Sequence, residues 1–468
     1  MSTTTKAETI DNDTIVAIST PPGRGGIGIV RLSGPAARSI VEPLLKLRHP
    51  LAPAQARFAE VLDTATSEVL DEAVVTYFAA PHSYTSEDIV EVAAHGSPVL
   101  LDYLLRQFIA AGARLAEPGE FTQRAFLSGR LDLTQAEAVH DLIEATTLYQ
   151  ARIAAQQLGG SLSRLISPIK EKLIALIAAL EAGIDFAEDD IDLVPANEII
   201  SQIESIHTAL NALEETFAYG RIVRDGFTLA IIGRPNAGKS SLFNRLVQRE
   251  RAIVTATPGT TRDTITESIS LEGVPVELID TAGLRDSADA PHDSAKLLDE
   301  AEFIGITKSR EAMAEADVLL LVLDATTPLH PEDKAIIAAS STRPFLVAIN
   351  KRDLAPITLT HRIAEATVET SALTGAGISE LRRAILKLIT TTTPTSETAL
   401  LTNLRQQQAV TTALAALSQA QRAVAAIIPH EMILLDLYAA LHALDALTGT
   451  TSTDDILHLI FSKFCIGK

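Results

Sequence analysis

The sequence is poor in cysteine and has no long apolar segment. Cys465 is the only cysteine among 468 residues, so no disulfide bond can form within the chain, and this usage fits a reducing compartment. The longest apolar runs, residues 173–180 and 318–323, are much shorter than a membrane-spanning helix. The first dozen residues lack the apolar core of a secretory signal. We therefore expect a soluble, cytoplasmic protein that has no membrane partner.

Basic residues are also scarce. The chain carries 39 Lys and Arg against 59 Asp and Glu, which gives a net charge of −20. A protein that binds nucleic acid over a broad surface needs the opposite balance, so any such role here depends on local patches or on a partner. Hydrophobic residues make up 47% of the chain, enough for sizeable cores, and the length is typical of about three domains.

Four stretches differ in their residue patterns. Residues 1–128 mix short β-rich runs with Gly/Pro turns and one helix-like stretch, which is an α+β pattern. Residues 129–221 and 389–468 are rich in Ala and Leu at helical spacing, the second stretch after a Thr-rich linker at 389–398. Residues 222–388 alternate strand-like runs with helices, as a doubly wound parallel sheet does. Because the two helical stretches share a composition, we infer one all-α helical domain into which the α/β domain is inserted.

A phosphate-binding motif opens the α/β stretch. Residues 233–240, GRPNAGKS, match G-x-x-x-x-G-K-[ST] and follow the strand-like run FTLAII, the context that this motif requires. Gly233 and Gly238 let backbone N–H groups close around the phosphates. Lys239 supplies a positive charge to the β- and γ-phosphates, and the Ser240 hydroxyl can bind Mg²⁺.

Four further elements follow in order, each at the end of a strand-like run. GTTRD (259–263) offers Thr261 as a second Mg²⁺ ligand, and DTAG (280–283) places Asp280 near the metal and the Gly283 N–H near the γ-phosphate. In NKRD (350–353), Asp353 can accept hydrogen bonds from guanine N1–H and N2–H₂, which adenine does not offer, and the backbone of SAL (371–373) can support guanine O6. This order resembles the GTPase superfamily with a Ras-like P-loop domain. The predicted GTP contacts are Asn236, Ala237, Gly238, Lys239, Ser240, Ser241, Thr255, Ala256, Thr257, Pro258, Gly259, Thr260, Thr261, Asp280, Thr281, Ala282, Gly283, Asn350, Lys351, Arg352, Asp353, Ser371, Ala372 and Leu373.

The residue after DTAG is Leu284, whereas Ras-like proteins have a glutamine there that orients the attacking water. Leucine cannot hydrogen-bond water, so either hydrolysis is slow or another group does this work. Asn236 is a candidate ligand for a monovalent cation, with backbone carbonyls of residues 255–261 completing the site. A K⁺ there would neutralise charge as an arginine finger does, an effect on the order of 10³–10⁵ in rate. The alternative is that Asn236 only caps the loop, and the spacing favours neither.

The chain as a whole resembles the MnmE (TrmE) family of tRNA wobble-uridine modification GTPases. The resemblance rests on TIVAISTPPGRGGIGIVRLSG (14–34), EPGEFTQRAFLSGRLDLTQAEAVHDLI (117–143), IDFAEDDI (184–191), GRPNAGKSSLFNRL (233–246), PGTTRD, DTAGLR and the terminal FCIGK. It implies a homodimer formed by N-terminal domains that bind 5-formyl-tetrahydrofolate or a related one-carbon carrier such as 5,10-methylene-tetrahydrofolate. It also implies a heterotetramer with the FAD- and NADH-using protein MnmG. Together they would add an aminomethyl-type group to C5 of the tRNA wobble uridine.

Site residues follow from the same resemblance. The K⁺ ligands would be Asn236, Thr255, Thr257 and Thr260, and Ser240 and Thr261 would hold Mg²⁺. The folate contacts would be Arg31, Glu91, Arg130 and Lys468, although Arg31 taken alone is typical of a surface salt bridge. The water-orienting carboxylate would be Glu302 in EFIGI, with Glu300 as its competitor.

Three departures from the family pattern bear on these assignments. The family commonly has Lys where this chain has Arg130, which keeps the charge but changes the geometry. The stretch AAHGSP (93–98) lacks two glycines expected around His95, and residues 286–306 contain an insertion next to Glu302. The glycine-rich run 23–28 satisfies G-x-G-x-x-G but continues as a strand, so we interpret it as a turn beside the folate pocket rather than a dinucleotide fingerprint.

The terminal FCIGK does not fit a prenylation box, because Gly467 and Lys468 follow the cysteine. The resemblance implies that Phe464 anchors the tail, that Gly467 allows close approach, and that Cys465 meets the one-carbon chemistry as nucleophile or acid/base. A different class of function is a ribosome-assembly or signalling GTPase switch that modifies nothing. Such proteins tend to carry a second GTPase repeat or a basic tail, and this chain has one GKS motif and an Ala/Leu-rich C-terminal stretch.

Overall fold

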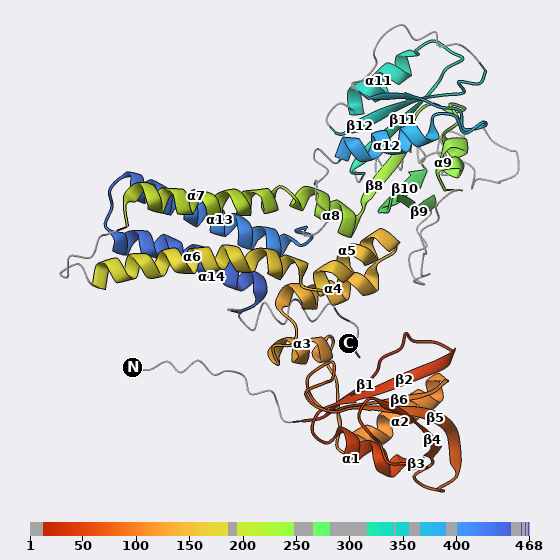
Figure 1. The fold of residues 1–468 in the computed structure, drawn as a ribbon. Helices are drawn as coiled ribbons and strands as arrows, with labels where there is room; N and C mark the ends of the chain where they lie inside the picture. The colour runs from red at the N-terminus through yellow and green to blue at the C-terminus, as the bar shows by residue number, and fades with distance from the viewer. Residues whose placement is uncertain are drawn as a thin grey trace, which may run out of the picture. The chain divides into compact units, whose positions relative to one another are not determined.

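The structure is a computed structural model that describes residues 13–185, 194–247, 265–280, 316–340, 343–354, 366–389 and 400–450, together with Ile460, Phe464 and Gly467. The chain forms two compact units, which are described one at a time (Figure 1). The first comprises residues 1–140, 157–170 and 438–468, and the second comprises residues 141–156 and 171–437.

The first unit is built on a seven-stranded sheet in the order β3-β4-β5-β6-β2-β1-β7. Its ladders are antiparallel apart from the short β1–β7 pair, and apolar side chains alternate with polar ones along the strands, so that one face packs against α2. The strands are β1 (Ile15–Ile18), β2 (Gly25–Ser33), β3 (Leu45–Leu47), β4 (Gln55–Leu62), β5 (Val69–Phe78), β6 (Ile89–Gly96) and β7 (Arg114–Leu115). The helices beside them are α1 (Ala37–Val41), η1 (Glu42–Leu44), α2 (Pro98–Ala110) and α3 (Glu120–Leu127).

A buried ion network ties the start of the described chain to α3. Arg124, whose side chain is 5% exposed, donates to Asp13 at 2.5 Å, to Glu87 at 3.2 Å and to Glu120 at 2.9 Å. Arg114 bonds both Asp13 and Glu120. Burial alone raises the pKa of Glu120, but bonds from Arg114, from the Glu117 N–H and from Arg124 outweigh it, so this pKa lies below its ordinary value. Burial also raises the pKa of Asp13, but hydrogen bonds from Arg114 and Arg124 outweigh it, so this pKa too lies below its ordinary value.

The second unit contains a six-stranded sheet in the order β13-β12-β11-β8-β10-β9. All neighbouring strands are parallel except β10 and β9, which form an antiparallel hairpin. The strands are β8 (Phe227–Ile232), β9 (Ile265–Leu271), β10 (Val274–Asp280), β11 (Val318–Asp324), β12 (Phe345–Asn350) and β13 (Thr367–Glu369). The helices flanking this sheet are α9 (Lys239–Val247), α11 (Pro331–Ser340) and α12 (Ile378–Ile389).

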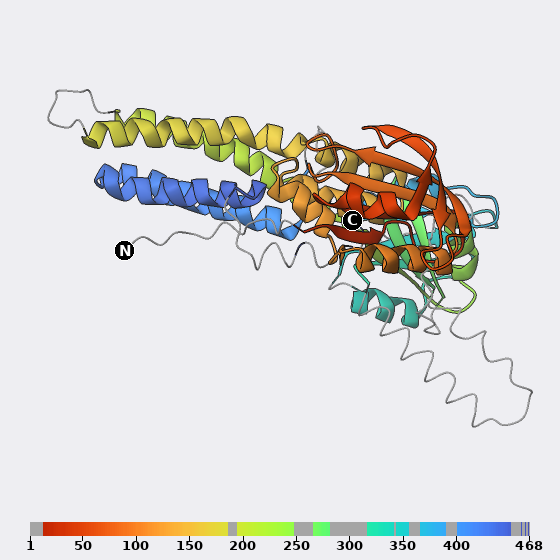
Figure 2. The ribbon, with the colours of Figure 1, turned by 90° about the horizontal axis from the view of Figure 1, so that it is seen from below.

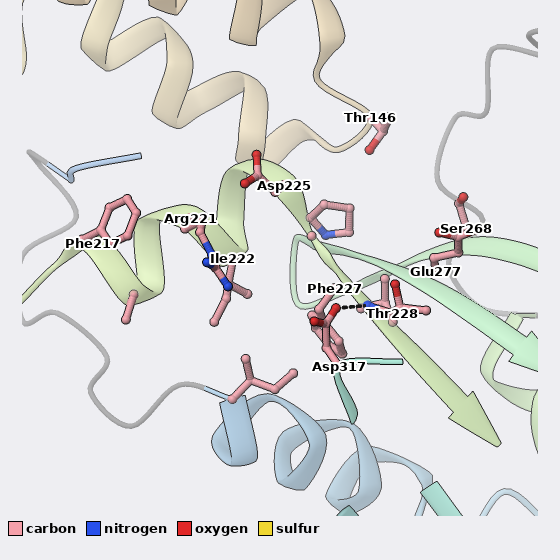
Figure 3. A pocket seen from close by; sticks show the side chains of 15 residues that line it. Thr146, Phe217, Arg221, Ile222, Asp225, Phe227, Thr228, Ser268, Glu277 and Asp317 are labelled. Atoms are coloured by element: carbon pink, nitrogen blue, oxygen red, sulfur yellow. Dashed lines mark hydrogen bonds between the residues drawn. The ribbon is translucent and has the colours of Figure 1, made fainter. Parts of the chain in front are cut away.

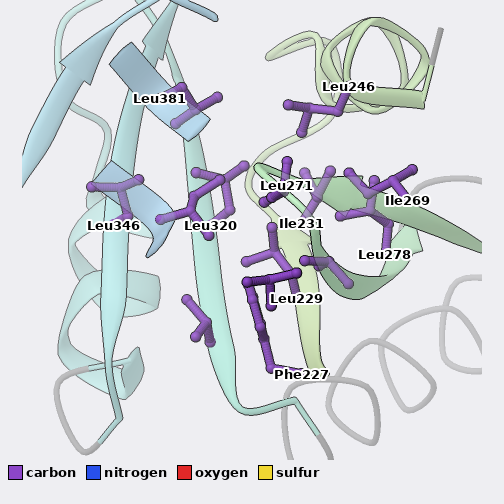
Figure 4. Close-up of a cluster of buried hydrophobic side chains, with 14 of the residues drawn as sticks. Phe227, Leu229, Ile231, Leu246, Ile269, Leu271, Leu278, Leu320, Leu346 and Leu381 are labelled. Atoms are coloured by element: carbon purple, nitrogen blue, oxygen red, sulfur yellow. The ribbon is translucent and has the colours of Figure 1, made fainter. Parts of the chain in front are cut away.

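Both faces of this sheet are covered. Leu229 and Ile231 of β8 pack with Leu246 of α9 and Leu381 of α12 on one face (Figure 4). The alternate residues of β8 pack on the opposite face, in a second cluster. Burial on both sides explains why β8, β11 and β12 are continuous apolar runs in the sequence.

The remaining helices range from 9 to 25 residues in length. They are α4 (Leu133–Glu144), α5 (Leu148–Leu158), α6 (Ser161–Asp185), α7 (Ala196–Glu214), α8 (Phe217–Asp225), α13 (Leu404–Ala425) and α14 (His430–Thr448). Within the second unit α7 and α13 lie side by side in both views (Figure 1, Figure 2), and His207 and Ser418 form a hydrogen bond between them at 3.2 Å. No helix in the described ranges is both long and apolar enough to cross a membrane.

Candidate functional site

The phosphate loop lies between the end of β8 and the start of α9, as the motif requires. Gly233, Gly238 and the exposed Asn236 all have positive φ, at +143°, +92° and +60°. A side chain at Gly233 would clash with the carbonyl of Val322, so the loop needs glycine there. Lys239 Nζ donates to the carbonyls of Gly233 and Arg234, both at 3.0 Å, which bends this charge back over the loop. Ser240 and Ser241 are exposed at the start of α9, and the N-terminus of a helix favours an anion.

Asn350, at the end of β12, joins the phosphate loop to the segment expected to meet the base. Its side chain is 1% exposed. Asn350 Nδ2 donates to the carbonyl of Ala237 at 3.1 Å, and the N–H of Ala372 donates to Asn350 Oδ1 at 3.0 Å. A side chain at Gly238 would clash with Asn350 Nδ2. One amide therefore fixes the relative positions of two predicted contact segments.

Two further contacts fix the base-side residues. Ser371 Oγ donates to Asp353 Oδ1 at 2.5 Å and orients this exposed carboxylate, while Ser371 itself is buried. Arg245 of α9 donates to the carbonyl of Leu373 at 3.2 Å. Arg352 instead forms an ion pair with Glu369 at 3.1 Å, on the rim.

Asp324, the last residue of β11, holds Lys351 at 2.6 Å. Burial alone raises the pKa of Asp324, but hydrogen bonds from Lys351 and from Thr326 outweigh it, so this pKa lies below its ordinary value. The pair positions the aliphatic part of Lys351 beside the base-side segment. Sequence reasoning missed Asp324, although an acidic residue at the end of a buried strand next to the phosphate-loop strand was a usable signal.

Several predicted site residues lie outside the described residues. They are Thr255, Ala256, Thr257, Pro258, Gly259, Thr260, Thr261, Thr281, Ala282, Gly283, Glu302, Cys465 and Lys468, and Asp280 is placed by its backbone alone. Among the described residues no three carboxylate, imidazole or thiol groups converge as a metal site. The Mg²⁺ and K⁺ assignments therefore depend on Ser240 and Asn236 and on segments outside the described ranges.

A cavity of about 820 Å³ opens at the other end of β8, away from the phosphate loop (Figure 3). It is lined by α8, by the starts of β8 and β10 and by Ile389. The Thr228 N–H donates to Asp317 at 2.9 Å in its wall. Its distance from the phosphate loop excludes it as the nucleotide pocket.

The first unit has a pocket of about 660 Å³ lined by Glu91, Arg130, Tyr84 and Ser83, among others. Arg31 and Glu91 are cross-strand partners on β2 and β6 and form an ion pair at 2.8 Å, about three-quarters buried. The guanidinium groups of Arg31 and Arg130 lie 6.0 Å and 5.5 Å from the centre of the Tyr84 ring. Burial raises the pKa of Tyr84, partly offset by its bond with Thr122 and by the two arginines. Three of the four predicted folate contacts thus converge here.

The glycine-rich run 23–28 is the turn and strand start that the sequence predicted, with β2 beginning at Gly25. Gly25 pairs with Gly96, whereas Arg31 pairs with Glu91 farther along the same ladder. Because each residue of a strand advances the chain by about 3.3 Å, the run lies well away from Glu91. It does not line the described pocket, and its place beside a bound folate stays a prediction.

The described tail residues are held in the first unit. Phe464 is buried with Leu133 and Ala136, and its ring lies 5.1 Å from that of His140. Ser19 Oγ donates to the carbonyl of Gly467 at 3.1 Å, and a side chain at Gly467 would lie 2.5 Å from the Ile18 carbonyl. The expected anchoring and close approach are therefore present. Ile18 follows Ala17, the partner of Arg31 on β1, so the tail passes near the strands that carry the predicted folate contacts.

Two family models match this chain. The first, GTP-binding protein TrmE N-terminus, covers residues 14–130, and the second, MnmE helical domain, covers residues 133–465. The chain belongs to the MnmE family. It is a P-loop GTPase in which an N-terminal α+β domain and helices accompany the Ras-like domain.

Curated relatives share nearly the full length. The chain is 56% identical over 461 residues to the tRNA modification GTPase MnmE of Koribacter versatilis, covering 98% of this chain and 99% of that protein. It is 42% identical over 456 residues to the MnmE of Aquifex aeolicus, covering 97% and 99%. A crystal structure of an Aquifex aeolicus Era variant bound to GDP.AlF4- is similar at 28% identity and a TM-score of 0.28, over 41% of this chain and 66% of that chain.

From the sequence, Tyr84 was not identified at all, and Asn350 was assigned only part of its role. Tyr84 forms the floor over which both arginines lie, and Asn350 was predicted only as a base-side contact, not as the bridge to the phosphate loop. Arg31 forms its ion pair with Glu91, which is itself a predicted folate contact.

Proposed function

We propose that the chain hydrolyses GTP and that this turnover serves tRNA modification: with MnmG, a carboxymethylaminomethyl-type group is added to C5 of the wobble uridine from a tetrahydrofolate one-carbon unit. The observation that supports it best is the Asn350 bridge, which brings the phosphate loop and the guanine-side segment together in a chain that matches its relatives from end to end. A cytoplasmic location, where tRNA is found, goes with this proposal.

For GTP, the described loop offers what a nucleoside triphosphate needs. The N-terminus of α9 and the charge of Lys239 suit the phosphates, and Asp353, oriented by Ser371, suits guanine. Ser240 and Thr261 would hold Mg²⁺, which neutralises phosphate charge when bound. Glu302 would orient the attacking water, so that hydrolysis yields GDP and phosphate.

For potassium, Asn236 fits as a ligand because its side chain is exposed at a left-handed position of the loop. Thr255, Thr257 and Thr260 would complete the site. When bound, K⁺ supplies positive charge where GTPases otherwise use an arginine finger. We expect GTP turnover by the full-length chain in K⁺ to exceed that in Na⁺ at least tenfold. Equal turnover in the two salts would exclude this part of the proposal.

For the folate, the pocket of the first unit offers cations for carboxylates and carbonyls and one carboxylate for a pterin N–H edge. Arg31, Arg130 and Lys468 would supply the cations and Glu91 the carboxylate, with the Tyr84 ring as an aromatic surface. Binding of 5-formyl-tetrahydrofolate, measured by titration calorimetry, tests this assignment. Cys465 would take part in the one-carbon chemistry beside this pocket.

We propose a homodimer and domain boundaries at 1–128, 129–221, 222–388 and 389–468, the third domain being an insertion. Exposed apolar side chains on β4 and β5 support self-association of the first domain, because such patches commonly mark protein–protein contacts. These side chains are Phe58, Val69, Leu70 and Val74. A heterotetramer with two MnmG chains follows from the dimer.

The experiment that tests the modification is mass spectrometry of wobble nucleosides in tRNA from a strain that lacks the gene. Loss of the modified uridine, restored by the wild-type chain, supports the proposal. If the deletion strain and the wild-type strain contain the same wobble nucleosides, a GTPase switch that modifies nothing is the better account.

A further inference from the structure

The hairpin of β9 and β10 occupies a special place in the sequence. It follows residues 248–264, which include three of the four predicted K⁺ ligands, and it leads directly into Asp280 and the DTAG motif. The two strands pair over their full length, from Val274 opposite Leu271 to Asp280 opposite Ile265. This continuous ladder links the nucleotide end of the hairpin to the turn at Glu272 and Gly273.

That turn is held by the first residues of α5. Thr147 Oγ1 donates to the carbonyl of Gly273 at 2.6 Å, and the Thr147 side chain is buried. Gly273 has φ +92°, and a side chain there would lie 2.5 Å from Cβ of Tyr149. The turn and the start of α5 are therefore packed without space for a side chain between them.

α5 is in turn joined to α8. The hydroxyl groups of Tyr149 and Tyr219 are 2.9 Å apart, and Gln150 Nε2 donates to the carbonyl of Arg224 at 2.8 Å. Arg224 Nε donates to Asp141 at 2.8 Å. Ile153 of α5 belongs to the same buried cluster as the hairpin residues Leu271 and Val274.

Elsewhere the junction between α8 and the sheet is open. The cavity of about 820 Å³ lies between α8 and the starts of β8 and β10 (Figure 3). At Gly226 this edge is closed, because a side chain there would lie 2.6 Å from the carbonyl of Pro275, and β10 is paired with β8 from Val276 to Asp280. The turn of the hairpin itself contacts the start of α5 at Thr147 and Tyr149.

We propose that Thr147, Tyr149 and Gln150 form a relay that transmits the nucleotide-dependent position of the β9–β10 hairpin to α5 and α8. The inference rests on GTP binding at the proposed site. A close-packed contact with a short hydrogen bond responds to displacement by switching rather than by stretching, because well-packed cores have few intermediate arrangements. The three residues are positioning residues and touch no nucleotide.

The test compares amide hydrogen exchange of the full-length chain in GDP and in a non-hydrolysable GTP analogue, with Mg²⁺ and K⁺. In the wild type we expect peptides covering 141–158 and 217–226 to change protection by about fivefold or more between the two states, the size of a typical coupling. In Thr147→Val the ratio between the states falls towards one. Gly273→Ala, which attacks the same contact from the hairpin side, has the same effect.

The matched control is Thr411→Val. Thr411 is exposed on α13 and belongs to neither the hairpin nor α5 nor α8, so this variant keeps the wild-type ratio. Binding of a fluorescent GDP is measured for every variant and stays within about twofold of the wild type, since no relay residue contacts the site. Failure of the wild type to bind guanine nucleotide would defeat the proposed function. A wild type that binds but shows no change at α5 and α8, or a Thr147→Val chain with the wild-type ratio, would overturn the relay alone.

Discussion

Replacement of Asn350 by alanine tests how the nucleotide site is assembled. The change removes the donor to the Ala237 carbonyl at 3.1 Å and the acceptor for the Ala372 N–H at 3.0 Å, in a side chain that is 1% exposed. Each buried polar group left without a partner costs about 1–3 kcal/mol, so two groups cost about 2–4 kcal/mol once some water enters the space. Because the two contact segments also lose their common support, we expect guanine nucleotide affinity to fall at least about tenfold, which corresponds to 1.4 kcal/mol.

The measurement is urea denaturation of the full-length chain followed by tyrosine fluorescence, together with titration of a fluorescent GDP. Asn244→Ala is the matched control, because Asn244 is exposed on α9 of the same domain, and its effect on the free energy of unfolding should stay within about 0.5 kcal/mol. If the two variants proved equally stable and bound GDP equally well, Asn350 would not bridge the segments as described.

Two further variants test the base contact and the buried ion network. Asp353→Asn exchanges an acceptor for a donor while Ser371 stays in place, so GTP affinity should fall about 100- to 1,000-fold. XTP presents a carbonyl at C2 and should bind this variant better than GTP does. A competition assay in which the variant keeps the wild-type preference for GTP would contradict the assignment. Arg124→Met removes the more buried cation of the network and leaves Arg114 as the partner of Asp13 and Glu120, so it should lower the free energy of unfolding by about 3 kcal/mol at pH 7, the lower end for a broken buried ion pair. The lowered pKa values of these carboxyls mean that their stabilisation is present above the unfolded-state pKa values, 3.8 and 4.5, and is lost as the pH falls through the folded-state values. The loss caused by Arg124→Met should therefore stay nearly constant from pH 7 to about pH 5 and shrink as the pH falls below 4.5 in urea titrations, and a loss that does not shrink below pH 4.5 would show that charge is not its origin.

Much of the architecture could be predicted because its signals are local. The apolar runs of β8, β10, β11 and β12 are long enough to mark buried strands, and the phosphate motif sits between a strand and a helix as expected. β9 was not predicted, because Ile265–Leu271 is an edge strand with alternating polar residues and pairs antiparallel with β10 in an otherwise parallel sheet.

Contacts between distant segments could not be predicted from local patterns. Arg31 and Glu91 are 60 positions apart in the sequence, and their pairing depends on the register of β2 and β6. The same holds for the Asn350 bridge and for the contact of Thr147 with Gly273, where an unremarkable turn meets the start of a helix. The sequence motifs indicate which residue types form the site, but strand register and loop packing determine which of them are in contact.

The central claim is that GTP turnover by this chain serves modification of the tRNA wobble uridine. Its most direct test is liquid chromatography–mass spectrometry of wobble nucleosides in a deletion strain complemented with the wild-type chain or with Asp353→Asn. We predict that the modified uridine disappears in the deletion strain, returns with the wild-type chain and does not return with the variant. Full modification in the deletion strain would contradict the claim, and full rescue by the variant would show that guanine nucleotide recognition is not required.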